Sequence, residues 1–169
     1  MSVLSLLIYA FVASFTPGPN NIMSLYYANQ FGWKPTFRFC LGVGLGFLTL
    51  LLLANSFSVF LNTVFPKVEF FMKMFGCVYL LFLAYKMITS RPGEEQRFNN
   101  RYNNLKSGVL LQYINPKAVI YAITVTATFV TPFYHHFLIQ FLFVVLLAAI
   151  GFSGTFSWSL FGSLFRNYC

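Results

Sequence analysis

The sequence predicts an all-α fold, a polytopic bundle of membrane-spanning helices. Hydrophobic residues make up 58% of the 169 residues and charged residues only 8%, whereas a soluble domain carries about 25% charged residues. Apolar stretches of about 20 residues, the length that crosses a bilayer as a helix, recur along the chain between polar connections. We therefore expect a protein that is embedded in membrane lipid.

Five stretches are clear candidate spans, because each supplies about 20 mostly apolar residues. The connection before the fourth stretch is long and polar, and the other connections are short. The expected spans are residues 2–28, 39–62, 68–88, 107–130 and 133–158.

The long connection divides the chain into two halves. We expect a single transmembrane domain over residues 1–169, with a first half at 1–89, a cytoplasmic linker at 90–106 and a second half at 107–169. After the fifth span, residues 159–169 supply only about half of a spanning helix, so a sixth span is expected to be incomplete. The first half contains three spans, an odd number, so the second half enters the membrane with the opposite polarity. This arrangement predicts an inverted 3+3 repeat.

The distribution of basic residues predicts the orientation, because cytoplasmic loops retain lysine and arginine. With the amino terminus outside, Lys67 and Lys73 lie near the outer side and most other basic residues lie on the cytoplasmic side. We therefore expect a multi-pass protein of the plasma (inner) membrane, with loop 90–106 in the cytoplasm. The expected cytoplasmic residues are Lys34, Arg38, Lys86, Arg91, Arg97, Arg101, Lys106 and Arg166.

The first and fourth spans are each interrupted by proline beside asparagine. The run Thr-Pro-Gly-Pro-Asn-Asn occupies residues 16–21, and the run Ile-Asn-Pro-Lys occupies residues 114–117. Proline removes a backbone donor and clashes with the preceding turn, and freed backbone groups at membrane depth are tolerated where they line a cavity. Helices broken at corresponding positions of two halves are typical of secondary transporters with a site near the midplane.

Polar side chains continue from both breaks along one helix face. Tyr121 and Thr124 follow Lys117 at spacings of four and three, and Ser24 follows Asn20 at a spacing of four. The helix starts at the breaks offer free amides and a positive dipole end, which favour a carboxylate. We expect a zwitterion to bind there. The candidate substrate-binding residues are Thr16, Pro17, Pro19, Asn20, Asn21, Ser24, Asn115, Pro116, Lys117, Tyr121 and Thr124.

Lys117 has two interpretations that the sequence leaves open. A lysine at the centre of a bilayer costs about 2.5–3.5 kcal/mol on insertion scales, and intramembrane charges are functional candidates by default. If the fourth helix begins near Asn115 instead of Ser107, however, the side chain lies near the interface and its ammonium snorkels into water.

The pattern Gly42-x-x-x-Gly46 has a structural interpretation. These glycines lie inside an apolar span with no strand before them, which disfavours a phosphate-binding loop. Small residues at this spacing let two membrane helices approach closely. We therefore expect a helix contact at this point.

Several function classes are disfavoured by what the sequence lacks. It contains no aspartate, and its three acids are Glu69, Glu94 and Glu95, so no span offers the several oxygen or thiolate ligands of a metal site. The sequence has no Ser-His-acid or Cys-His cluster and no basic aromatic groove. We expect that the protein is not an enzyme, that it binds no cofactor or metal, and that it has no nucleic-acid partner.

Three runs of the sequence, in order, resemble one family. Residues 15–21, the glycine-rich run 41–46 after the basic loop 33–38, and residues 108–118 look like the LysE/RhtB-type amino-acid exporters, the lysine, homoserine/threonine and cysteine efflux proteins. The resemblance implies a secondary exporter of about six helices that works by proton exchange. Where many members carry an acid after the glycines, this chain has Phe47, so exporters of neutral amino acids and of cysteine are the more similar members.

These observations favour a secondary transporter that exports small, mainly neutral amino acids or related metabolites. A second interpretation stays open: a non-transporting membrane interaction or structural subunit derived from a truncated transporter, which the incomplete last helix favours. The expected partners are an amino-acid substrate, membrane lipid and, as an open option, further copies of the chain in a homo-oligomer.

Overall fold

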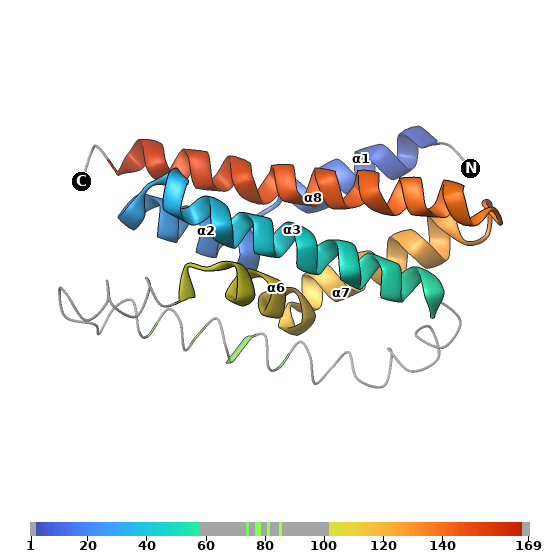
Figure 1. The fold of residues 1–169 in the computed structure, drawn as a ribbon, viewed down its shortest axis with the longest axis horizontal. Helices are drawn as coiled ribbons and strands as arrows, with labels where there is room; N and C mark the ends of the chain where they lie inside the picture. The colour runs from blue at the N-terminus through green and yellow to red at the C-terminus, as the bar shows by residue number, and fades with distance from the viewer. Residues whose placement is uncertain are drawn as a thin grey trace.

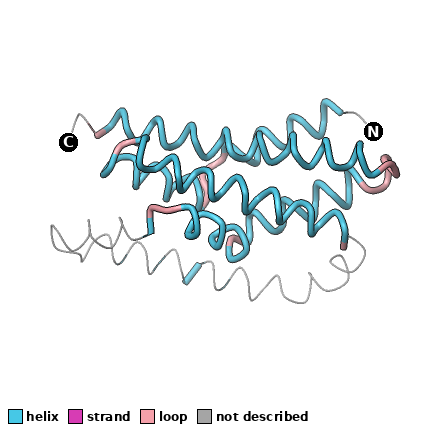
Figure 2. Tube along the Cα trace, in the orientation of Figure 1, coloured by secondary structure: helices cyan, strands magenta, loops and turns pink. Residues whose placement is uncertain are grey.

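The computed structural model describes residues 3–57 and 102–166, and the isolated residues 74, 77, 78, 81 and 85. Every element in these ranges is helical, as the coloured segments of Figure 2 show, so the predicted all-α class is confirmed for the described part of the chain. The elements are α1 (Val3–Phe15), α2 (Pro19–Phe31), α3 (Trp33–Ser56), α6 (Leu105–Ile114), α7 (Pro116–Thr124), the π-helix η1 (Val125–Val130) and α8 (Phe137–Phe165).

Two described helices, α3 and α8, are each long and apolar enough to cross a membrane. The helices α1 and α2 reach that length only together, and they are bent by 47° at the first break. The segment Pro116–Val130 is a shorter apolar helix. Two spans are therefore present in the described ranges, or three if the bent pair is one span. The expected span at 68–88 lies outside the continuous described ranges.

The helices run along one common direction, with α3 and the pair α6–α7 opposite in polarity to α1–α2 and α8. In Figure 1, α1 and α2 lead away from the end that holds the amino terminus, α3 returns, and α8 leads away again to the carboxyl terminus. The helix α8 packs against α2 and α3, and α3 also packs against α6. The outer face of α8 is apolar and exposed: the side chains of Phe137 and Leu138 are 76% and 65% exposed. Such a face suits lipid, as the composition predicts.

The ends of two helices differ from the expected bounds. The helix α3 begins at Trp33, six residues before the expected start, because Pro35 lies in the first turn, where backbone N–H groups have no intrahelical partner. Gly32 makes the preceding tight turn possible, since its φ of 85° favours glycine.

At the other end of the chain, α8 continues through Trp158 to Phe165. Residues 159–165, expected to begin an incomplete sixth helix, are instead its last turns. No proline interrupts this run, and Gly162 packs directly against the backbone of Leu25 in α2, which holds these turns in place.

Glycines set the closest helix contacts. A Cβ built on Gly42 would collide with the carbonyl of Leu105, and one built on Gly46 would lie 2.9 Å from the Cα of Val109. Opposite them, a Cβ on Gly108 would collide with the carbonyl of Phe39. The predicted helix contact at Gly42 and Gly46 is therefore confirmed, and it joins α3 to α6.

Candidate functional site

The first helix break leaves the last carbonyls of α1 without helical partners, and side chains from three helices satisfy them. The side-chain amide of Asn21 donates to the carbonyls of Ser14 over 2.9 Å and Thr16 over 3.0 Å. The indole N–H of Trp158 donates to the carbonyl of Phe15 over 3.0 Å. The ammonium of Lys117 also donates to the carbonyl of Thr16, over 2.7 Å. The break is thus a defined polar structure inside the bundle.

The second break is organised by one asparagine. Asn115 ends α6 and caps α7, because its side-chain oxygen accepts the backbone N–H of Lys117 over 3.1 Å. Pro116 follows at the first position of α7, where its missing N–H costs no helical hydrogen bond. Asparagine and proline therefore specify this helix start locally.

A chain of side-chain amides joins the two breaks. Asn115 Nδ2 donates to Asn20 Oδ1 over 3.1 Å, and Asn20 Nδ2 donates to Gln112 Oε1 over 2.8 Å. Gln112 Nε2 then donates to the carbonyl of Val43 in α3 over 3.0 Å. Asn115 and Gln112 are buried, with 3% and 2% exposed. The amides leave few free donors or acceptors, so the three helices are held in one arrangement.

A second polar cluster links α2 to α8 and α3. The hydroxyl of Thr155 donates to Asn21 Oδ1 over 3.1 Å, and the hydroxyl of Ser24 donates to the carbonyl of Thr155 over 2.9 Å. The same Ser24 oxygen lies 3.2 Å from the sulfur of Cys40. These four side chains are buried, and their contacts fix α2 between its neighbours.

A cavity of about 50 Å³ lies between the two breaks. Holding one water molecule takes about 10–15 Å³, so the cavity has room for a few waters. Its wall is polar near the breaks and aromatic or small elsewhere. The lining residues are Ala13, Ser14, Gly18, Asn20, Asn21, Phe47, Gln112, Asn115, Lys117, Ala118, Tyr121, Gly151 and Thr155.

The structure brings five of the predicted site residues to this cavity: Asn20, Asn21, Asn115, Lys117 and Tyr121. The other six do not line it. Thr16 lies beside it and contributes its carbonyl, Ser24 is used in the cluster with Thr155, and the remaining four belong to the breaks or to the end of α7. Those four are Pro17, Pro19, Pro116 and Thr124.

Several lining residues were missing from the predicted set. Gln112 precedes Asn115 by three positions, on the same side of the helix, and this spacing could have pointed to it. Phe47, Gly151 and Thr155 carried no such signal, because they reach the cavity only through the packing of α3 and α8.

Lys117 is the one charged side chain that lines the cavity. It is partly buried, and its stem lies over Gly18, where an added Cβ would be 2.9 Å from Lys117 Cδ. The described ranges contain no Asp or Glu, so no carboxylate in them neutralises this ammonium. In the same ranges, no group of three metal-ligating side chains occurs. The cavity therefore offers one cation among neutral hydrogen-bonding groups.

Tyr121 closes the aromatic side of the cavity. Its side chain is 5% exposed, and its hydroxyl makes no hydrogen bond although the Ser14 side chain lies beside it. A buried hydroxyl without a partner costs roughly 1–3 kcal/mol.

Comparison with known proteins gives consistent matches over nearly the whole chain. Residues 11–167 match the model of a family described as LysE type translocator. A protein of Escherichia coli K12 named cysteine/O-acetylserine efflux protein is 34% identical over 159 residues, which cover 94% of this chain and 81% of that protein. Proteins of the same name from Shigella flexneri serotype 5b and from Escherichia coli O6:K15:H31 match with the same identity and coverage. No solved structure matches.

Proposed function

Because this chain belongs to the LysE type translocator family, we propose that it is a secondary transporter that exports small neutral amino acids, or metabolites related to them, across the plasma membrane. The family consists of translocators, so the chain is a transporter and not an enzyme. The relatives named for efflux of cysteine and O-acetylserine support a substrate that combines an α-carboxylate, an α-ammonium and a short uncharged side chain.

The meeting of the two helix breaks around Lys117 carries this proposal. The cavity holds one ammonium group without a described carboxylate partner, and the start of α2 beside it has no side-chain cap. A substrate carboxylate placed between Lys117 and this helix start would gain a charge-assisted hydrogen bond and the favourable end of the helix dipole. The ammonium would exchange its present acceptor, the carbonyl of Thr16, for the substrate.

The neutral part of the lining supports a zwitterion over a cationic substrate. The oxygens of Asn20, Asn21 and Gln112 each accept one hydrogen bond within the protein, and each has a second lone pair that suits an α-ammonium group. A second positive charge on the substrate side chain would lie near Lys117 with no carboxylate among the described residues to balance it.

We propose further that the transport cycle enlarges this cavity by moving the helix breaks. A cavity of about 50 Å³ is too small for an amino acid, so binding requires the breaks to separate. Proton exchange is the proposed energy source, and a pH gradient imposed across proteoliposomes would test it. Uptake that does not respond to the gradient would contradict proton exchange without contradicting the substrate class.

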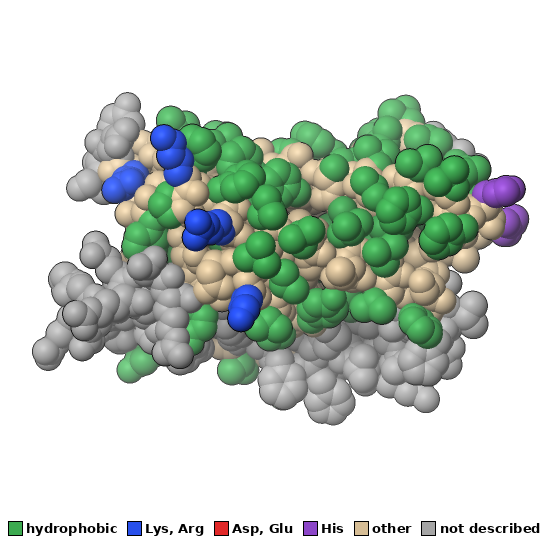
Figure 3. Space-filling view, in the orientation of Figure 1, with side chains coloured by type: hydrophobic (Ala, Val, Ile, Leu, Met, Phe, Trp, Pro, Cys, Tyr) green, Lys and Arg blue, Asp and Glu red, His purple; other side chains and the backbone are tan. Residues whose placement is uncertain are grey.

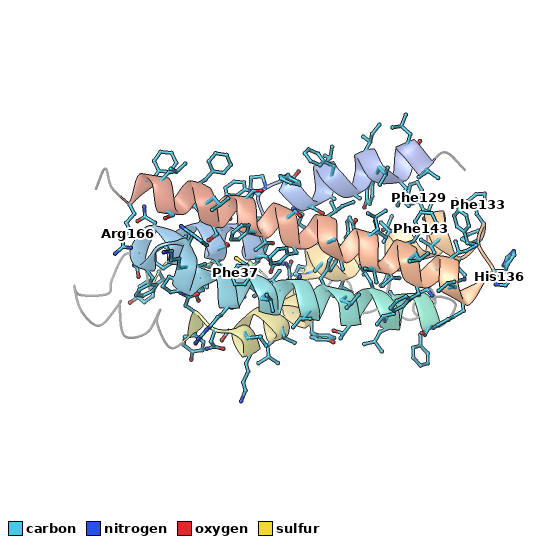
Figure 4. All side chains as sticks on the ribbon, turned by 45° about the horizontal axis from the view of Figure 1, so that its top comes forward. Phe37, Phe129, Phe133, His136, Phe143 and Arg166 are labelled. Carbon is cyan, nitrogen blue, oxygen red and sulfur yellow. The ribbon has the colours of Figure 1, made fainter. Side chains whose placement is uncertain are left out.

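The proposed topology has the amino terminus outside, five spans in one domain and an inverted repeat of two halves. The bent pair α1–α2 and the pair α6–α7 run in opposite directions in Figure 1, as halves of inverted polarity would. The lysine and arginine side chains visible in Figure 3 lie toward the end that holds the carboxyl terminus, and the histidines lie at the other end. Figure 4 labels Arg166 and His136 at these two ends. By the positive-inside rule, the Arg166 end is cytoplasmic.

The alternative is a non-transporting membrane interaction or structural subunit derived from a truncated transporter. Counterflow by the wild-type protein, described below, distinguishes it from a transporter. A homo-oligomer remains compatible with the open apolar faces of the helices.

Counterflow of labelled amino acids into proteoliposomes tests the proposed function. We expect saturable counterflow of small neutral amino acids by the wild-type protein and its loss in Lys117→Met and Asn115→Ala. The matched control is Lys106→Met, since Lys106 is an exposed lysine away from the cavity. Absence of counterflow from folded wild-type protein would refute the transporter proposal. Unchanged counterflow in Lys117→Met would refute the role of Lys117.

A further inference from the structure

The cavity between the helix breaks is lined by two chemically different sets of side chains. Lys117 and the amides of Asn20, Asn21 and Asn115 are charged or polar, whereas Phe47 offers an apolar ring. A zwitterion that places its carboxylate at Lys117 and its ammonium at the amide oxygens leaves the apolar lining at Phe47 for its side chain.

The ring of Phe47 rests directly on a glycine of α8. A Cβ built on Gly151 would lie 2.7 Å from Cδ1 and 2.8 Å from Cε1 of Phe47. Real Cβ atoms do not approach ring carbons so closely, so the absence of a side chain at Gly151 is what lets the ring occupy this position. Both residues line the cavity.

A row of aromatic rings supports Phe47 from the other side. Its ring centroid lies 5.2 Å from that of Tyr121, and Tyr121 stacks on Tyr9 at 5.7 Å. Tyr9 in turn stacks on Phe129 at 5.9 Å, and Phe129 is labelled in Figure 4 near the end of the bundle that holds His136. Phe47 is 6% exposed. The ring is therefore enclosed between α8 and this row and has little freedom to withdraw when a larger ligand enters.

We infer that Phe47, held in position by Gly151, is the residue that limits the length of the side chain that the site accepts. This inference rests on the proposed function, because it assumes that an amino acid occupies the cavity. The accepted class is an α-amino acid with a short, uncharged side chain. Longer aliphatic side chains collide with the ring, and charged ones meet no opposite charge there.

The helices α3 and α8 also contain a second contact between a glycine and a phenylalanine, outside the cavity. A Cβ built on Gly44 of α3 would lie 3.2 Å from Cβ and Cδ2 of Phe152 in α8. This contact repeats the glycine-on-phenylalanine packing with the two helices exchanged, but neither residue lines the cavity. Substitutions at Gly44 and Phe152 thus reproduce the packing change without reaching the site.

The test is counterflow in proteoliposomes with alanine, 2-aminobutyrate, norvaline and leucine, a series in which the side chain grows by one carbon at a time. We expect wild-type protein to favour the short members. Phe47→Ala is expected to raise the ratio of leucine to alanine transport at least tenfold, since one methylene in a pocket changes discrimination by about 10–200-fold. Phe47→Leu, a milder change, is expected to give an intermediate ratio.

Gly151→Ala should narrow the cavity, whereas Phe47→Ala widens it. The new Cβ pushes the ring of Phe47 into the cavity, so transport of alanine should fall at least tenfold, and the double variant with Phe47→Ala should restore it. Such a rescue separates a blocked cavity from a misfolded protein. Gly44→Ala and Phe152→Ala should leave the leucine to alanine ratio within twofold of wild type.

The outcomes distinguish this inference from the proposed function. If wild-type protein gives no counterflow of any member, the proposed function fails and the inference fails with it. If wild-type protein transports alanine but Phe47→Ala and Phe47→Leu leave the ratio unchanged, the inference alone is overturned. A change of equal size in Phe152→Ala would also overturn it.

Discussion

The side-chain amide of Asn115 donates a hydrogen bond of 3.1 Å to the side-chain oxygen of Asn20, a residue 95 positions earlier in the chain. Asn20 directly follows Pro19 and Asn115 directly precedes Pro116, so this bond connects the two helix interruptions directly. Asn115 also caps α7, because its side-chain oxygen accepts the backbone N–H of Lys117. One residue therefore serves both the local structure of a helix start and the tertiary contact between two helices.

Asn115→Asp and Asn115→Ala should separate these two roles. Aspartate keeps an oxygen that accepts the N–H of Lys117, whereas alanine loses the cap, at a cost of about 1 kcal/mol. Both variants leave the side-chain oxygen of Asn20 without its donor, and only alanine also loses the cap, so we expect the larger decrease in melting temperature in Asn115→Ala. Tryptophan fluorescence of the purified protein during heating measures the melting temperatures of both variants. Equal melting temperatures for the two variants would contradict the capping role.

Asn21→Leu should be strongly destabilising. The leucine side chain has a similar size but leaves the carbonyl of Ser14 and the hydroxyl of Thr155 without their present partner, while the carbonyl of Thr16 keeps Lys117 as a donor. Each buried unsatisfied group costs about 1–3 kcal/mol, so we expect a loss of roughly 3 kcal/mol or more in unfolding free energy, measured by denaturant titration in micelles. Ser153→Ala is the control, because that exposed hydroxyl bonds only within its own helix. A loss no larger than in the control would show that the break tolerates unpaired carbonyls.

Gly162→Ala should weaken the packing of α8 on α2. The added methyl group collides with the backbone of Leu25, which cannot move aside as a side chain can. Overpacking of this kind costs about 1–3 kcal/mol. Gly44→Ala is a control, because its methyl group meets only the side chain of Phe152. Thermal unfolding of the two variants should show the larger destabilisation at Gly162, and the reverse order would mean that the last turns of α8 are loosely packed.

Gly18→Ala should impair transport with little effect on stability. Gly18 has an extended backbone (φ −166°) that alanine also adopts, but the new Cβ would lie 2.9 Å from Lys117 Cδ and displace that flexible side chain. If Lys117 binds the substrate carboxylate, KM should rise roughly tenfold, the loss expected for a weakened hydrogen bond to a charged group. Counterflow kinetics and a melting curve measure the two properties. A lower melting temperature with unchanged KM would assign Gly18 a purely structural role.

Single cysteines in a cysteine-free background should reveal the orientation. The positions are Lys106→Cys, in the first turn of α6, and His136→Cys, directly before α8; both residues are exposed, and the starts of these two helices lie toward opposite ends of the bundle in Figure 1. A membrane-impermeant thiol reagent added to intact cells should label His136→Cys, and Lys106→Cys should become reactive only after permeabilisation. The reverse pattern would place the amino terminus in the cytoplasm.

Local chemistry explains the parts of the fold that could be predicted. The breaks at Pro19 and Pro116 follow from the missing N–H of proline, and the cap at Asn115 follows from the preference of asparagine for helix starts. The contact of Gly42 with α6 follows from the spacing of small residues. The end of α8 was not predictable in this way. Residue 158 was the expected end, but the helix continues because Gly162 finds a close partner in Leu25, which is distant in the sequence.

The amino-acid sequence by itself determined that the chain is an apolar helical protein with two interrupted helices, and that asparagine and Lys117 follow the interruptions. Only the tertiary structure decided which side chains meet at the cavity. Phe47, Gly151 and Thr155 line it because α3 and α8 pack at a particular rotation and distance. These quantities depend on contacts between glycines and distant backbone atoms, and periodicity within one helix carries no information about them.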